Sequence, residues 1–371
     1  MDNITSCASP YAKDIEFNGL LNRKASFASS LAKCLLRELS NRQLSSWSLS
    51  ALTCMADGYV PDSNAWWVPE IPSLIKWLSK PTTLPPKFKI ELFCLRGSRQ
   101  NTQGAFSLSN DFGFGTLDGV PARFLAGQEF SMINGRLIID GEPLQESGDI
   151  NYLQASLFLG SADLFKKTIN EERDNAPQLE KNIDRHLHEL HKKALDLLSL
   201  TGVDSRWITA AVTNLYITES SEQSSRSGSW DKHCGLSYYS RRDNPAWIAD
   251  ILLHEACHQN FYFLNLNESL HEDDHIQRLS PAVNEPRPIW ALLLAYHAFA
   301  NVSVYYQKLG SLESEELFRY AYRNFDYALK TETLLNECKF SNRTALHFFE
   351  TLKACFHSIK GAYLDSPHRV H

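Results

Sequence analysis

The spacing of apolar residues changes twice along the chain. Over residues 17–57, apolar residues recur every three or four positions, which predicts helices. Residues 88–144 are rich in glycine and turn signals, which predicts a β segment. From Pro245 onward the helical spacing returns, and no strand of comparable strength follows. The pattern predicts a mainly helical α+β protein, with a central β segment and a helical C-terminal half.

Short sequence signals place turns and strands within the β segment. Residues 89–97, "KIELFCLRG", contain β-branched and aromatic residues that predict a strand. The pairs Asn134-Gly135 and Asp140-Gly141 suit tight hairpin turns. We therefore expect antiparallel hairpins in this part of the chain.

The chain between the β segment and Pro245 mixes helix and strand. Residues 162–200 are charged and amphipathic, which predicts a long helix that ends at Thr201-Gly202. Residues 206–218, "RWITAAVTNLYIT", and residues 233–240, "HCGLSYYS", predict two short strands.

Shifts in composition suggest three regions in the 371-residue chain. They are a helical N-terminal region at 1–85, a β-rich segment at 86–160 after the proline-rich "SKPTTLPPKF", and a mainly helical region at 161–371. The chain is long enough to bury a sizeable core, and the three regions could equally form one continuous domain.

Charge and cysteine content limit the classes of partner and compartment. A formal net charge of -6 is too small to indicate nucleic acid or an anionic membrane as a partner. The eight cysteines are scattered without a C-x-x-C pair, which is typical of reduced thiols rather than a zinc knuckle or a disulfide scaffold. The N-terminus has no apolar core of a signal peptide, and we expect no membrane span. A cytoplasmic protein is predicted.

One stretch carries recognisable chemistry: residues 250–260, "DILLHEACHQN", place His254, Glu255 and His258 in the spacing H-E-x-x-H. Asn244 suits the N-cap of a helix, so the motif is expected on a helix. Residues four apart share a helix face, so the two imidazoles can bind one cation, with the glutamate beside them.

The neighbours of the motif distinguish a metal site from a chance match. H-E-x-x-H arises by accident in roughly a few per cent of chains of this length. Apolar residues flank the motif here, and two uncommitted histidines on an apolar helix would be costly. By contrast, "HLHELH" at residues 186–191 lies among lysines and acids, which predicts a solvated face. We therefore predict a metal site at the H-E-x-x-H helix alone.

A catalytic metal usually takes three protein ligands, so a third is expected downstream. His297 lies in the apolar run "PIWALLLAYHAFANV" and is the preferred candidate, with Glu285 as the alternative. His275, in "HEDDH", suits an exposed loop. The glycine and histidine of the extended metzincin motif are absent after His258, as is a helical E-x-x-x-D pattern of gluzincins.

The segments "GLSYYS", "AWIADILLHEACHQ" and "EPRPIWALLLAYHAFANV" together resemble a known family, over roughly residues 200–355. The resemblance is to the H-E-x-x-H-containing peptide modification proteins found with ribosomally made peptide natural products. Its more specific part is the Arg-Pro pair followed by an apolar helix. The resemblance implies an Fe(II)- and 2-oxoglutarate-dependent oxygenase that uses O2 to hydroxylate a β-carbon of a precursor peptide.

The resemblance also implies roles for individual residues. It makes His254 and His258 the iron ligands, and His297 becomes the expected third, although family members often carry a histidine nearer the position of Leu294. Arg287 is a candidate to bind the distal carboxylate of 2-oxoglutarate, because guanidinium binds carboxylates bidentately. The alternative for this arginine is an ordinary ion pair at a helix entry with the nearby glutamate.

Two other functions compete with the oxygenase. In a zinc peptidase, Glu255 would be the general base that activates a zinc-bound water, whereas in the oxygenase it would orient a water or the co-substrate. A degenerate scaffold would bind a peptide and use the histidines structurally. For a peptide substrate, we expect docking by strand addition within residues 88–144.

Overall fold

The computed structural model describes residues 5, 7–8, 10, 14–39, 44–58, 71–79, 90, 93–94, 105–107, 113–117, 120–124, 127–133, 136–143, 152–154, 157–159, 185–212, 214–218, 227–229, 234–268, 270, 276–310 and 315–364. Its contacts define two compact units. The first contains residues 1–20, 190–208 and 242–371, and the second contains residues 21–189 and 209–241. The fold is a mainly helical α+β protein, as predicted. The division at 85 and 160 stays a prediction.

Helices form the start of the chain, which confirms the prediction from apolar spacing. They are α2 (Asp14–Glu38), α3 (Ser46–Ala56) and α4 (Ile71–Ser79). Ser45 caps α3, because its side chain accepts a hydrogen bond from the backbone N–H of Ser48 at 3.0 Å.

The strand predicted over residues 89–97 is wrong at the residues that the structure describes there. Ile90, Phe93 and Cys94 are helical, and all three are buried. Phe93 and Cys94 follow Ile90 by three and four positions, so the three residues share one helix face. Burial of this face outweighs the β propensity of the residue types.

Antiparallel hairpins make up the central β segment. A four-stranded sheet has the order β1-β4-β5-β6, and β2 pairs with β3 in a separate ribbon. The bounds are β1 (Ala105–Ser107), β2 (Gly113–Leu117), β3 (Val120–Phe124), β4 (Glu129–Ile133), β5 (Arg136–Ile139) and β6 (Glu142–Pro143).

The hairpin turn predicted at Asp140-Gly141 is confirmed, whereas Asn134 and Gly135 lie outside the described residues, between two paired strands. Ile133 pairs with Arg136, and Ile139 pairs with Glu142, so two residues connect the strands in each case. Asp140 and Gly141 have φ values of 53° and 85°, as the residues of a type I′ turn require.

A five-stranded sheet in the second unit has the order β10-β11-β9-β8-β7. Its strands are β7 (Tyr152–Gln154), β8 (Leu157–Leu159), β9 (Asn214–Thr218), β10 (Ser227–Ser229) and β11 (Leu236–Ser240). β11 confirms the strand predicted in "HCGLSYYS", and it runs parallel to β9.

The strand predicted over residues 206–218 is only half correct. Its first part forms the short helix α8 (Ser205–Thr209), and the strand begins at Asn214. Asp204 explains the difference, because its carboxylate accepts a hydrogen bond from the backbone N–H of Arg206 at 2.9 Å and so caps a helix.

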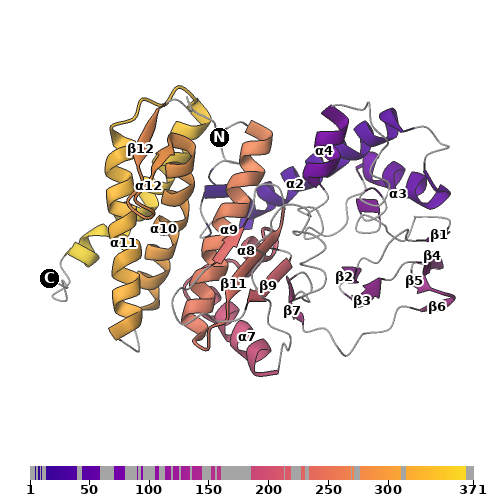
Figure 1. Ribbon diagram of the computed structural model, residues 1–371, viewed down its shortest axis with the longest axis horizontal. Helices are drawn as coiled ribbons and strands as arrows, with labels where there is room; N and C mark the ends of the chain where they lie inside the picture. Colours follow the sequence, from indigo (N-terminus) through magenta and orange to yellow (C-terminus); the bar gives the residue numbers. More distant parts are fainter. Residues whose placement is uncertain are drawn as a thin grey trace. The chain divides into compact units, whose positions relative to one another are not determined.

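The first unit is a helical assembly around α10 (Ile289–Leu309), which contacts α9 (Pro245–Glu268), α11 (Glu315–Asn336) and α12 (Arg343–Leu364) (Figure 1). Among the described helices, α10 alone is long and apolar enough to span a membrane by length and composition, and most of it is buried inside the protein. Its first nineteen residues carry no Asp, Glu, Lys or Arg.

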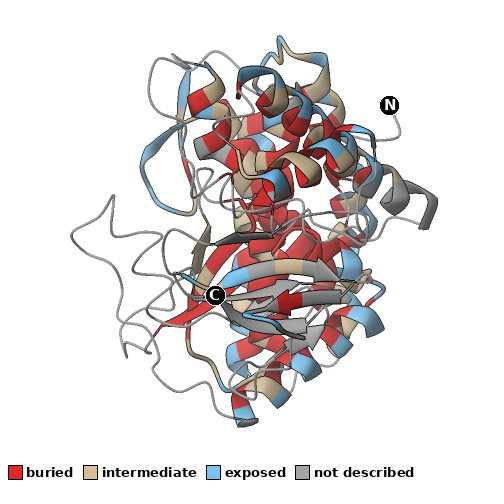
Figure 2. Cartoon of the chain, turned by 90° about the vertical axis from the view of Figure 1, so that its right-hand side faces the viewer, coloured by how far each residue is buried: buried red, intermediate tan, exposed pale blue. Residues whose placement is uncertain are grey.

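The long helix predicted before Thr201 is described as α7 (Arg185–Leu200), and Gly202 follows it with φ of 82°. Residues 161–184 lie outside the described part of the chain. The solvated face predicted for "HLHELH" is wrong at His191, which is completely buried, whereas His186 is exposed. His191 shares a helix face with Ala194 and Leu198, so position on the face decides its burial. Figure 2 shows buried and exposed residues alternating around the helices in this way.

Candidate functional site

The helix α9 carries the H-E-x-x-H motif, and its first turn is fixed by the predicted cap. The Asn244 side chain accepts a hydrogen bond from the backbone N–H of Ala246 at 2.8 Å, and its carbonyl accepts one from Ile248 at 3.2 Å. Pro245 occupies the first helical position, where a missing N–H costs no hydrogen bond. The cap therefore fixes where the helix begins and which residues share the face of His254.

We predict that replacing Asn244 with alanine destabilises the start of α9 by about 1 kcal/mol, because the side-chain cap is lost. Amide hydrogen exchange of peptides from α9 should accelerate, while peptides from α12 exchange as in the wild-type protein. Equal exchange in the variant and the wild type would contradict the role of this cap. Asn342→Ala, which removes the corresponding acceptor for Thr344 and Ala345 before α12, is the matched control and should affect α12 instead.

The two motif histidines point their Nε2 atoms at each other. These atoms lie 2.9 Å apart, and the ring centroids are separated by 4.6 Å. Both residues are half-buried, whereas Leu253 and Cys257 beside them are completely buried. The prediction that the pair shares one helix face is therefore correct. The structure places the two rings at the edge of a buried helix.

Protein atoms around the two rings favour their neutral forms. Burial lowers the pKa of His254 to about 4. Burial also lowers the pKa of His258 well below its ordinary value, with further contributions from the charges of His254 and His297. A neutral imidazole is the form that binds a metal, so neither ring has to lose a proton to do so at neutral pH.

The separation of the two nitrogens is compatible with one bound cation. If a metal ion bound both nitrogens with bonds of about 2.0–2.1 Å, the angle between the two bonds at the metal would be near 90°. The same distance also suits a hydrogen bond between opposite tautomers of the two rings. His258 Nδ1 has no hydrogen-bond partner among the described residues, whereas a ligating histidine usually donates that N–H to a neighbour.

His297, the predicted third ligand, lies on α10 and is completely buried. Its ring is surrounded by aromatic side chains, with centroid distances of 4.9 Å to Phe348, 6.3 Å to Trp207 and 6.5 Å to Phe261. Neither ring nitrogen makes a hydrogen bond of good geometry within the described residues. Burial lowers its pKa to about 3, although the nearby backbone of Ala8 and Cys257 favours the charged form.

The described residues do not include a complete set of metal ligands. Among the described residues, no group of three or more His, Cys, Asp or Glu side chains is close enough to hold a metal ion. A positive charge on His297 would nevertheless lower the pKa of His258, and a positive charge on His254 would lower the pKa of His297. His297 as the third ligand therefore stays a prediction, and His275 lies outside the described residues.

Arg287, the predicted ligand for 2-oxoglutarate, lies on the short strand β13 (Pro286–Pro288). Its guanidinium donates to the carboxylate of Glu285 at 3.0 Å, and the two side chains are 46% and 65% exposed. The structure thus contains the ordinary ion pair that the sequence offered as the alternative. Binding of a co-substrate by this arginine stays a prediction, as does ligation by Glu285.

Glu255 is buried, with 1% of its surface exposed. Its charge contributes to the raised pKa values of Asp250 and Cys257. The glutamate therefore lies near these two groups of α9, within the buried part of the site.

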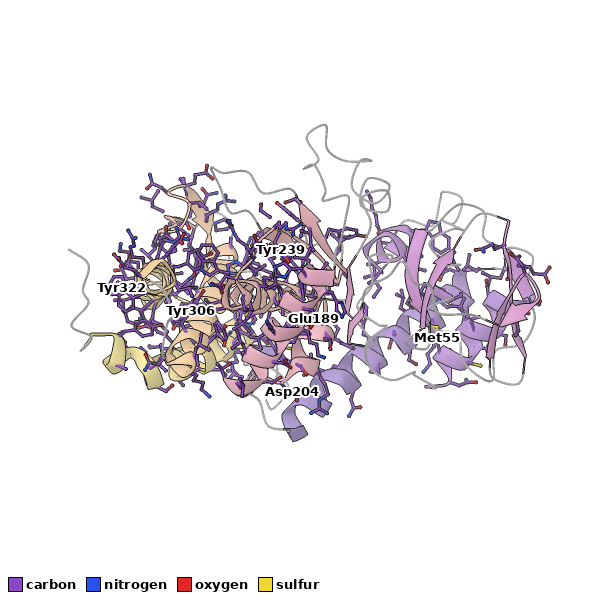
Figure 3. The ribbon with its side chains drawn as sticks, turned by 90° about the horizontal axis from the view of Figure 1, so that it is seen from below. Met55, Glu189, Asp204, Tyr239, Tyr306 and Tyr322 are labelled. Carbon is purple, nitrogen blue, oxygen red and sulfur yellow. The ribbon has the colours of Figure 1, made fainter. Side chains whose placement is uncertain are left out.

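Asp250, one turn before His254 on α9, was not predicted from the sequence as part of the site. Asp250 is 3% exposed and accepts a hydrogen bond from the hydroxyl of Tyr306 on α10 at 2.8 Å. Burial raises its pKa to about 7 despite that hydrogen bond. Figure 3 marks Tyr306 within the helical unit. The available signal was an acidic residue four positions before a motif histidine in an apolar run.

Asn301, a second residue that was not predicted from the sequence, connects the two site helices. Its side-chain amide donates to the His297 carbonyl at 2.9 Å and lies 3.6 Å from Cys257 Sγ on α9. Asn301 thus holds α10 against the helix of the imidazole pair.

No protein-family model matches this chain, and no curated protein matches it.

Proposed function

We propose that the protein is an Fe(II)- and 2-oxoglutarate-dependent oxygenase that hydroxylates a β-carbon of a residue in a ribosomally made precursor peptide. The observation that carries this proposal is the pair of neutral imidazoles on α9, with Nε2 atoms 2.9 Å apart at a partly exposed edge. The family resemblance over roughly residues 200–355 supplies the reaction class.

The resemblance, rather than the spacing of the pair, selects iron over zinc. The two Nε2 atoms, 2.9 Å apart, can occupy neighbouring positions around either metal. Six-coordinate Fe(II) with open positions is the arrangement of non-heme oxygenases, and with 2-oxoglutarate and O2 it supplies the oxidising power for hydroxylation.

Individual residues have separate roles in the proposed reaction. We propose that His254 and His258 hold the metal through Nε2, with His297 as the third ligand. Arg287 would exchange its partner Glu285 for the distal carboxylate of the co-substrate, since both are carboxylates bound in the same way. Glu255, which is buried beside the pair, would orient a water or the co-substrate rather than act as a base.

The visible spectrum of the complex with iron and keto acid tests this proposal without the peptide. Fe(II) followed by 2-oxoglutarate, added anaerobically to metal-free protein, should give a broad charge-transfer band. The band should disappear in His254→Ala and in His258→Ala. His186→Ala, which removes an exposed histidine of α7, should retain it.

A different result would support the zinc peptidase. If no band forms, zinc binds tightly and peptide hydrolysis is lost in Glu255→Gln, the oxygenase proposal is wrong. If neither Fe(II) nor zinc is retained, the histidines are structural and both enzyme functions are excluded.

A further inference from the structure

The hairpin that connects α9 to α10 is a two-stranded ribbon. It consists of β12 (Gln277–Leu279) and β13, and neither strand pairs with a further strand among the described residues. Large apolar side chains on and beside it are exposed: Leu279 is 57% exposed and Val283 is 51% exposed. A ribbon with an open edge and exposed apolar residues is a place where an additional strand can bind.

The register of the ribbon determines which backbone groups face its open edge. The N–H of Ser280 donates to the carbonyl of Glu285 at 2.9 Å, so these residues form a hydrogen-bonded pair. Two residues further, Arg278 and Arg287 occupy the next such position. The N–H and C=O groups of Gln277 and Leu279 therefore point away from β13.

Prolines close the other edge of the ribbon to strand addition. Pro286 lies opposite Leu279, and Pro288 lies opposite Gln277. These two positions of β13 face outward, and proline has no N–H to donate. A peptide strand can therefore add to β12 and not to β13.

The side chains on the ribbon indicate the chemistry of the strand that would bind. Arg278 and Arg287 are directly opposite each other, and like charges in that position are unfavourable. Glu285 pairs with Arg287, whereas Arg278 bonds only to the carbonyl of Gln277, at 3.1 Å, and has no carboxylate partner among the described residues. Leu279 lies on the opposite face of the strand. An added strand would thus place acidic side chains on one face and apolar ones on the other.

We propose that β12 binds, by strand addition, an extended peptide segment in which acidic and apolar residues alternate. This proposal deepens the proposed function, and rests on it, insofar as the segment belongs to the precursor peptide. The binding itself needs no metal. It places docking on this hairpin, whereas the sequence suggested residues 88–144.

Peptide binding to the metal-free protein tests the charge requirement. The probe is fluorescein-labelled Gly-Gly-Glu-Val-Glu-Val-Glu-Val amide, measured by fluorescence anisotropy at low ionic strength. We expect saturable binding that becomes about five- to tenfold weaker in the double variant Arg278→Gln/Arg287→Gln, and no binding when lysine replaces glutamate in the probe. Arg319→Gln/Lys330→Gln removes two exposed charges of α11 and should bind as the wild type does.

Methylated probes test whether the backbone pairs. Alternate N–H groups of a strand face the same side, so only one set can bond to β12. Methylation of the valine amides should abolish binding if the peptide runs antiparallel, and methylation of the glutamate amides should do so if it runs parallel. The proposal is overturned if binding survives both modifications or is lost equally with both. It is also overturned if the double variant Arg278→Gln/Arg287→Gln binds the probe as the wild type does. Because no metal or turnover is involved, such a failure leaves the test of the iron complex unaffected.

Discussion

The metal-free His297→Leu variant is expected to gain about 2 kcal/mol of stability relative to the wild-type protein when the pH is lowered from 7.5 to 5. His297 is completely buried, and burial lowers its pKa to about 3. The folded protein therefore leaves this ring neutral at pH 5. The unfolded chain protonates it with a pKa near 6.5, so the contribution of His297 to stability is lost as the pH falls below that value.

Comparison of two proteins isolates the contribution of one ring. His254, His258 and Asp250 also titrate with shifted pKa values, but they are present in both proteins and largely cancel in the difference. Leucine is close to histidine in volume, and its own side chain brings no polar atom into the space between Trp207, Phe261 and Phe348.

Urea unfolding at a series of pH values, with a chelator present, measures this difference. His186→Leu, which removes an exposed histidine of α7, is the matched control. A stability difference between His297→Leu and the wild type that is the same at pH 5 and pH 7.5 would contradict a neutral buried ring.

Local signals in the sequence were sufficient where one residue decides the structure. The Asn244 cap and the Asp140-Gly141 turn each act through their own backbone and neighbours, and both were predicted. Residues Ile90 and His191 were mispredicted because their environment depends on which helix face the fold covers. Such burial is set by tertiary packing, which residue propensity does not encode.

The candidate site shows the same division. The motif predicted that two imidazoles share one face of α9, because that follows from helical spacing alone. The partners supplied by other helices were not predictable in this way. Tyr306 bonds to Asp250, and Asn301 contacts Cys257, only because α10 lies against α9.

Replacing His258 with alanine is expected to lower the affinity of the protein for Co(II), a spectroscopic substitute for Fe(II), by more than about 100-fold. A lost ligand should cost more than the 10- to 100-fold effect of a lost neighbour of a ligand. His254→Ala should behave in the same way, because the two Nε2 atoms face each other at 2.9 Å. Isothermal titration gives the affinities, and His186→Ala is the control.

The same titration decides the role of His297. If His297→Leu weakens Co(II) binding as strongly as His258→Ala does, the ring leaves its aromatic surroundings to become the third ligand. If the affinity is unchanged, the metal is held by the α9 pair with another donor. The visible spectrum adds the geometry, because six-coordinate Co(II) absorbs weakly and tetrahedral Co(II) strongly. Weak absorption is expected if the site holds six-coordinate iron, as proposed, and strong absorption would instead favour zinc and hydrolysis.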